Sequence, residues 1–239
     1  MVRGQSNDLP DTAGSTEIFA FNQEIENPII PFYGSTDSRL FAIERRCMDR
    51  DGKVIATLNQ LLPQGRILDV GAGSGFTAVR LRNRQRSVIP LEPSRGMIDR
   101  RRNLPWVRGM AQTLPFKDSS FDGAYATWAY FFPGFGYGEA GLKEVDRIVH
   151  SKGTELFVDN AGDDDFCALF QQNIASDSKW WVNQGFSVQY LETSFRFDNL
   201  EESERLISSY WSGNGRAPGS RIALEYSFRV AIYHRKRSS

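Results

Sequence analysis

Runs of apolar residues recur along this chain between polar stretches, and their spacing predicts strands that alternate with helices. Six runs bounded by polar residues predict strands over 67–69, 87–91, 121–126, 154–158, 186–197 and 222–232. Helical spacing of apolar residues predicts helices over 74–84, 137–150 and 199–211, and a helical stretch over 35–62 that is broken at Asp51 and Gly52. Strands and helices in this order favour an α/β fold.

The first of these strands ends at Asp69 and runs directly into Gly71, Gly73 and Gly75. Glycine accepts positive φ angles and lets a ligand approach the backbone, and the N–H groups that open the next helix attract polar ligand atoms. A dinucleotide fingerprint would place its third glycine where this chain has Phe76, and the lysine of a phosphate-binding loop is absent from the sequence. The loop is therefore predicted to bind a ligand, but it lacks the sequence features that hold a diphosphate group.

The D-x-G-x-G-x-G loop resembles motif I of the class I methyltransferases, which use S-adenosylmethionine. Three further stretches resemble the same family: E-P-S-R-G-M at 92–97, G-M-A-Q-T-L-P-F-K-D-S-S-F-D at 109–122, and L-K-E-V-D-R-I-V-H-S-K-G at 142–153. The resemblance implies a doubly wound, Rossmann-like sheet of seven strands, mostly parallel with an antiparallel last strand, and with helices on both faces. It implies S-adenosylmethionine as the cofactor and S-adenosylhomocysteine as the product.

The resemblance also assigns residues to the cofactor. Glu92, at the end of the second strand, is expected to bind the ribose hydroxyls, and Ala111 and Gln112 to lie against the adenine. The full set expected at the cofactor is Asp69, Gly71, Gly73, Gly75, Glu92, Pro93, Met97, Ala111, Gln112 and Trp128. One departure concerns Met110, which stands where the family often has an aspartate that accepts from the adenine amino group.

Candidates for substrate binding and catalysis follow the later strands, because ligands of open α/β sheets lie outside the carboxyl ends of the strands. The candidates for lining the substrate pocket are Tyr33, Phe131, Phe132 and Trp211, although such aromatic residues are also often core. A base that removes a proton from the acceptor would be Asp159, Tyr130 or Tyr33. For Asp159 the alternative is a structural role, in which it accepts hydrogen bonds from loop amides.

Composition limits the partners. The 29 basic and 29 acidic residues balance, so net charge gives no case for nucleic acid or for an anionic membrane, and the partner is expected to be a small molecule. Nine arginines between Arg80 and Arg108 are interpreted as the solvated faces of outer helices. Cys47 and Cys167 are expected to be reduced thiols, and no apolar run is long enough to span a membrane, so the sequence predicts a cytoplasmic protein.

No spacing of histidine or cysteine predicts a metal site. The chain is expected to hold a loose tail over 1–16, a lid with helices over 17–62, and a methyltransferase domain over 63–239 with a helical insertion near 199–211; a homodimer is possible. The predicted function is transfer of a methyl group to an oxygen or nitrogen of a small metabolite by in-line displacement. The alternatives are carbon methylation of a quinone or lipid acceptor, and a regulatory protein that binds S-adenosylmethionine without catalysis.

Overall fold

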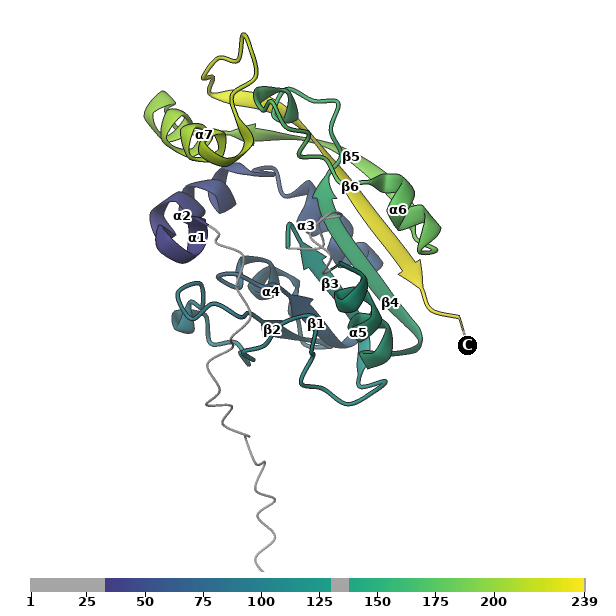
Figure 1. Cartoon of the computed structure of the whole chain (residues 1–239). Helices are drawn as coiled ribbons and strands as arrows, with labels where there is room; N and C mark the ends of the chain where they lie inside the picture. Colours follow the sequence, from purple (N-terminus) through teal and green to yellow (C-terminus); the bar gives the residue numbers. More distant parts are fainter. Residues whose placement is uncertain (1–32, 130–137, 239) are drawn as a thin grey trace, which may run out of the picture.

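The computed structural model describes residues 33–129 and 138–238, which form an α/β fold around one mixed sheet (Figure 1). The six strands have the spatial order β2-β1-β3-β4-β6-β5. Their bounds are β1 Gly65–Val70, β2 Arg86–Leu91, β3 Phe121–Thr127, β4 Val149–Asn160, β5 Ser187–Arg196 and β6 Glu225–Lys236. Strands β1 to β4 pair in parallel, whereas β6 runs antiparallel to both β4 and β5. The predicted Rossmann-like sheet, mostly parallel with an antiparallel last strand, is thus confirmed.

The expected count of seven strands is wrong for the part of the chain that is described, which holds six strands. After β2 the chain returns along the edge of the sheet but pairs there at a single parallel bridge, between Leu91 and Val107. The Val107 N–H donates to the Pro90 carbonyl, and Val107 accepts from the Glu92 N–H. Pro90 and Pro105 have no N–H, so the bonds that would extend this bridge toward the start of β2 cannot form.

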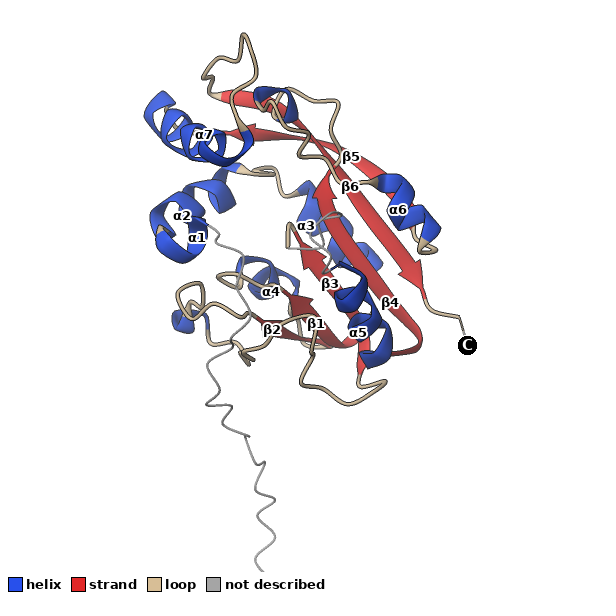
Figure 2. Cartoon of the chain, viewed as in Figure 1, coloured by secondary structure: helices blue, strands red, loops and turns tan. Residues whose placement is uncertain are grey.

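Helices cover both faces of the sheet, as predicted (Figure 2). Helices α2, α3, α4 and α7 contribute to one buried apolar cluster, and α5 and α6 contribute to a second cluster on the opposite face. Their bounds are α1 Tyr33–Thr36, α2 Ser38–Cys47, α3 Lys53–Leu61, α4 Phe76–Leu81, α5 Gly138–Ile148, α6 Ser178–Asn183 and α7 Leu200–Asn214. None of the described helices has both the length and the apolar character needed to cross a bilayer.

The break predicted within 35–62 separates α2 from α3. Asp37 caps α2 by accepting from the Arg39 and Leu40 N–H groups, and Gly52 opens α3 with a φ of 73° that favours glycine. Helix α2 then lies beside α7, the insertion predicted near 199–211 (Figure 1). The two helices are joined by a hydrogen bond from the Tyr210 hydroxyl to Glu44 and by ion pairs that include Arg46 with Glu202.

Candidate active site

The glycine loop leaves the carboxyl end of β1 and turns into α4. Gly71, Gly73 and Gly75 have φ angles of 70°, 55° and 74°, all in the left-handed region. A Cβ on Gly71 would lie 2.7 Å from the Ala129 Cβ, and one on Gly73 would lie 3.0 Å from Phe41 Cζ. The loop therefore needs glycine both for its backbone conformation and for the space above it.

Glu92, the acid that follows β2, lies directly beside this loop. The side chain is buried, its Oε2 accepts from the Gly73 N–H at 2.8 Å, and its Oε1 accepts from the Ser94 N–H at 2.9 Å. Burial raises the pKa of Glu92, and these two N–H groups oppose the rise. Because each carboxylate oxygen has a second lone pair, Glu92 can still accept from a ligand with two hydroxyl groups.

Asp69 is the second carboxylate of the site. It is 1% exposed, and neither of its oxygens accepts a hydrogen bond from the residues that are described. Burial raises the pKa of Asp69 to about 7, which the Tyr125 hydroxyl on the neighbouring strand and the charge of Arg45 partly oppose. Tyr125 lies close but outside hydrogen-bonding geometry. A buried carboxylate without partners is costly, so Asp69 is suited to a positively charged or hydrogen-bonding ligand group.

Arg45 and Phe41 reach this site from α2, and sequence reasoning missed both. The Arg45 guanidinium lies 4.9 Å from the ring centre of Phe76 and 5.4 Å from that of Trp128, and its Nη2 lies 3.5 Å from Thr77 Oγ1. The signal that was available is their spacing of four residues, which places both side chains on one face of the helix. Arg45 adds a cation to a site that already holds two buried carboxylates.

Trp128 and Asp159 extend the site to the ends of β3 and β4. The Trp128 indole N–H donates to Asn160 Oδ1 at 3.0 Å, and its ring stacks on Phe228. Asp159 is 4% exposed, and burial raises its pKa to about 7. Its Oδ1 accepts from the Asn160 N–H at 2.8 Å, which is the structural role left open by the sequence. No described residue donates to Oδ2, so this oxygen can still take a proton.

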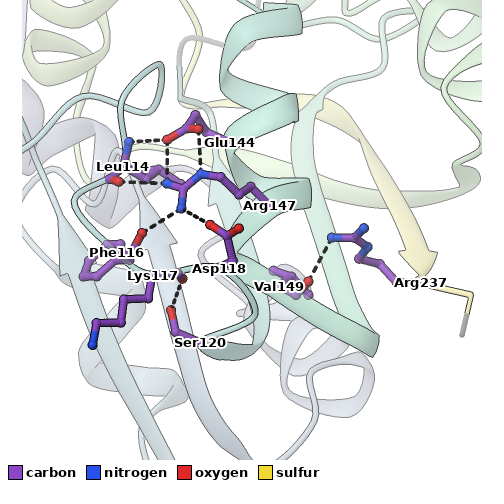
Figure 3. Close-up of polar contacts among 9 residues, drawn as sticks. All are labelled: Leu114, Phe116, Lys117, Asp118, Ser120, Glu144, Arg147, Val149 and Arg237. Atoms are coloured by element: carbon purple, nitrogen blue, oxygen red, sulfur yellow. Dashed lines mark hydrogen bonds and ion pairs between the residues drawn. The ribbon is translucent and has the colours of Figure 1, made fainter.

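The loop over 109–120 is held by α5, which brings together two of the stretches that carry the family resemblance (Figure 3). Arg147 donates to the carbonyls of Leu114 and Phe116 and pairs with Asp118. Glu144 accepts from the Leu114 N–H at 2.7 Å and pairs with Arg147, which lowers the pKa of Glu144. These contacts fix the loop against α5.

Within this loop Ala111 is buried and belongs to the core cluster around α5. Gln112 is partly exposed, but its Oε1 is buried and accepts no hydrogen bond from the described residues. Met110 pairs with Thr113 in an isolated bridge that closes the loop. Gln112 therefore holds a buried acceptor without a described donor, two residues after the position where the family often has an aspartate.

The other residues expected at the cofactor or the substrate have the following positions. Met97 is buried, and its Cε would lie 3.4 Å from a Cβ on Gly73; the Pro93 carbonyl accepts from Arg108 at 3.5 Å. Trp211 is tied to the loop after β4, because its indole N–H donates to the Leu169 carbonyl and Arg216 lies over its ring. Tyr33 opens α1, and Tyr130, Phe131 and Phe132 lie outside the described residues. Among the side chains that are described, no group of three or more potential ligands is arranged for a metal ion.

Comparison with known proteins finds similarity to methyltransferases, in agreement with the resemblance seen in the sequence motifs. Residues 68–157 match a family model described as a methyltransferase domain. The chain is 36% identical over 93 residues to a demethylmenaquinone methyltransferase of Corynebacterium kroppenstedtii, a match that covers 38% of this chain and 40% of that protein. It is 29% identical over 192 residues to a protein of the same name from Beutenbergia cavernae, covering 74% of this chain and 79% of that one.

Solved structures share the fold. The YcgJ protein of Bacillus subtilis superposes with a TM-score of 0.51 at 17% identity, over 79% of this chain and 97% of that one. The [4+2]-cyclase SpnF superposes with a TM-score of 0.53 at 16% identity, over 80% and 81%. At this level of identity the likeness concerns the fold alone.

Proposed function

We propose that this chain, a class I S-adenosylmethionine-dependent methyltransferase by its domain, transfers the cofactor's methyl group to a small acceptor molecule. The observation that carries the proposal is the joined pair of the glycine loop and Glu92, in which the Gly73 N–H is bonded to the acid that ends β2. The match to the C. kroppenstedtii relative covers less than half of that protein, so the proposal rests also on the geometry of the site.

The residues present fit this cofactor. Glu92 has lone pairs free for the two ribose hydroxyls, and the glycines leave the backbone open to close approach. The Asp69 carboxylate, buried without partners, and the Arg45 guanidinium would hold the ammonium and carboxylate of the amino-acid part. When bound, the cofactor supplies a methyl group already activated by its attachment to a sulfonium.

The protein's own tasks are then to orient the acceptor, to exclude water and to accept a proton. Asp159 is suited to accept the proton, because it is buried at the carboxyl end of β4 and its pKa of about 7 lies near neutrality. Trp128 and Asn160, joined by a hydrogen bond, lie beside it at the carboxyl ends of β3 and β4. Tyr33, Tyr130, Phe131, Phe132 and Trp211 are kept as candidates for contacts with the acceptor.

The acceptor atom is proposed to be an oxygen or nitrogen of a small metabolite. A second candidate is carbon methylation of a quinol-type acceptor, which is favoured by the names of the relatives from Corynebacterium and Beutenbergia. A base such as Asp159 serves either reaction, because loss of a hydroxyl proton makes a phenol more nucleophilic at both its oxygen and its ring carbon. The position of a labelled methyl group in the product distinguishes the two.

The first test is calorimetric titration with S-adenosylhomocysteine, with NAD as the control ligand. Binding at micromolar strength by the unaltered protein is expected, together with a loss of about tenfold or more in Glu92→Ala and Gly73→Val. The matched controls are Glu201→Ala and Gly213→Val in α7, where Glu201 is exposed and a Cβ on Gly213 would meet no other atom. Absence of binding by the unaltered protein would withdraw the proposal.

The second test is a screen of small phenols, amines, carboxylates and quinols with methyl-labelled cofactor. Transfer of label to one of these classes supports catalysis, and the product identifies the acceptor atom. Tight binding of S-adenosylhomocysteine with no transfer to any acceptor would instead support the regulatory alternative.

A further inference from the structure

A groove of about 510 Å³ lies at the opposite end of the sheet from the glycine loop. It is lined by Gly65, Arg66, Arg82, Asn83, Arg84, Gln85, Arg86, Ser87, Val88, Leu104 and Pro105. Gly65 and Arg86 are the first residues of β1 and β2, whereas the glycine loop follows the last residue of β1. Since β1 has six residues, the two sites are separated by roughly 17 Å along the strand.

The lining of this groove carries four arginines and no acidic residue. Arg66, Arg82 and Arg84 are exposed at its rim. The Arg66 guanidinium lies over the Phe121 ring, and Arg82 donates to the Asn103 carbonyl, so two of the three rim side chains are already oriented by neutral groups. Their charges are not neutralised by these contacts.

The fourth arginine, Arg86, is 2% exposed. Its guanidinium donates to the carbonyls of Pro63, Leu81, Asn59 and Leu62 and to Asn59 Oδ1, so its hydrogen bonds are satisfied entirely by neutral oxygens. Several of these carbonyls lie at the carboxyl ends of α3 and α4, whose dipoles favour a cation. Because no described carboxylate pairs with Arg86, its guanidinium adds to the positive charge of the groove.

The charge of the surrounding segment has the same sign. Residues 80–108 include nine arginines and two acids, a net charge of +7 in a chain whose total is zero. Of the two acids, Glu92 is buried at the glycine loop and Asp99 pairs with Arg101 and Arg102. Asp122, beside the groove, accepts from the Arg66 N–H and pairs with His150. Of the nine arginines, Arg82, Arg84 and Arg86 line the groove, and Arg66 of β1 adds a fourth positive charge there.

We propose that this groove binds the oligophosphate group of a small ligand, at a site separate from the methyl-transfer site. Guanidinium groups match the geometry of phosphate oxygens and remain charged at all physiological pH values. The size of the groove suits a small molecule. A single-stranded nucleic acid is less well matched, because none of the lining residues is aromatic and a base would have no ring to stack on.

The test is calorimetric titration of the full chain with pyrophosphate at low salt. The groove variant Arg82→Gln/Arg84→Gln should bind at least tenfold more weakly than the unaltered protein. The control variant Arg39→Gln/Arg221→Gln removes the same charge from exposed arginines elsewhere and should bind as the unaltered protein does. S-adenosylhomocysteine should bind both variants equally, which checks that the groove variant is folded and that the methyl-transfer site is intact.

Three comparison ligands identify the class. Orthophosphate should bind more weakly than pyrophosphate, and ATP at least as tightly, whereas an RNA oligonucleotide should not displace pyrophosphate at equal phosphate concentration. The proposal is overturned if the unaltered protein shows no pyrophosphate binding at millimolar concentration, if both double variants lose it equally, or if RNA displaces it. None of these measurements depends on methyl transfer, so they succeed or fail independently of the proposed function.

Discussion

Asp69 and Asp159 are both buried at the carboxyl end of the sheet, and burial raises the pKa of each to about 7. Their surroundings differ. Asp69 lies near the positive charge of Arg45 and beside Tyr125, whereas the one group that opposes the rise for Asp159 is the Asn160 N–H. Asp69 is therefore suited to hold a cationic ligand group, and Asp159 to exchange a proton.

Replacing Asp159 by Asn tests the second role. If Asp159 accepts the proton, kcat/KM of the unaltered protein should rise with pH through about 7 as Asp159 loses its own proton. The variant should lose this rise, and its kcat/KM should be lower by about 10² or more. Affinity for S-adenosylhomocysteine should be unchanged, since Asp159 is not among the residues proposed to hold the cofactor. Unchanged turnover would leave Asp159 with the structural bond to Asn160 as its only role.

Arg45 can be tested by comparing two ligands. The variant Arg45→Gln should bind S-adenosylhomocysteine about tenfold more weakly, because a charge-assisted contact to the amino-acid part is lost. Binding of 5′-methylthioadenosine, which lacks that part, should change little. The matched control is Arg39→Gln, an exposed arginine on the same helix. Equal losses for both ligands would show that Arg45 only stabilises the loop.

At the scale of elements, α2 joins the glycine loop to α7. One set of its side chains, Phe41 and Arg45, reaches the loop, and Glu44 accepts from the Tyr210 hydroxyl of α7. Exposed ion pairs between these parts of the chain, such as Arg205 with Asp37, add little individually. The hydrogen bond from Tyr210 to Glu44 contributes more to stability. The Glu44 carboxylate is 8% exposed, so it relies on donors of the protein rather than on water.

Tyr210→Phe removes this donor without changing the ring. It should lower the free energy of unfolding by about 1–3 kcal/mol and weaken S-adenosylhomocysteine binding several-fold, although Tyr210 is not among the residues proposed to hold the cofactor. Tyr190→Phe, at an exposed tyrosine of β5, is the control and should alter neither. Urea unfolding and calorimetry measure the two effects. A loss of stability with unchanged affinity would mean that α2 keeps its place without α7.

Elements with local signals in the sequence could be predicted, whereas contacts between distant segments could not. Strands such as 87–91 and the break at Gly52 could be predicted because apolar spacing and glycine conformation are local properties. The position of Arg45 could not, since its contact with Thr77 joins residues 32 apart in sequence. The count of seven strands came from the resemblance, and it is not met in the described residues, where Pro90 and Pro105 act against a further strand beside β2.

At the scale of the whole molecule, the buried carboxylates set how stability depends on pH. A carboxyl group whose pKa is higher in the folded state favours folding when it is protonated, so this contribution is lost as pH rises from about 4 to about 7. His150, whose pKa is raised by Asp122, acts in the same direction. Carboxylates whose pKa is lowered, such as Asp122 and Glu144, act oppositely, but below about pH 4.

The protein without cofactor should therefore unfold at higher urea concentration at pH 5.5 than at pH 8. Asp159→Asn should raise the melting temperature at pH 8 by at least about 2 °C, because no charge is then buried at this position. At pH 5.5 the difference between the variant and the unaltered protein should shrink. A variant that is equally stabilised at both pH values would show that Asp159 does not titrate in this range.

The place of β6 in the sheet bears on how the chain is made. β6 leaves the ribosome after the other five described strands, yet it lies between β4, which ends at Asn160, and β5, which ends at Arg196. The half of the sheet that carries the glycine loop is thus synthesised first, and β5 has no neighbouring strand until β6 arrives. Pairing between segments so distant in sequence is slow. Throughout that interval β5 is an open edge, the segment of the nascent chain that a chaperone would need to shield from other chains.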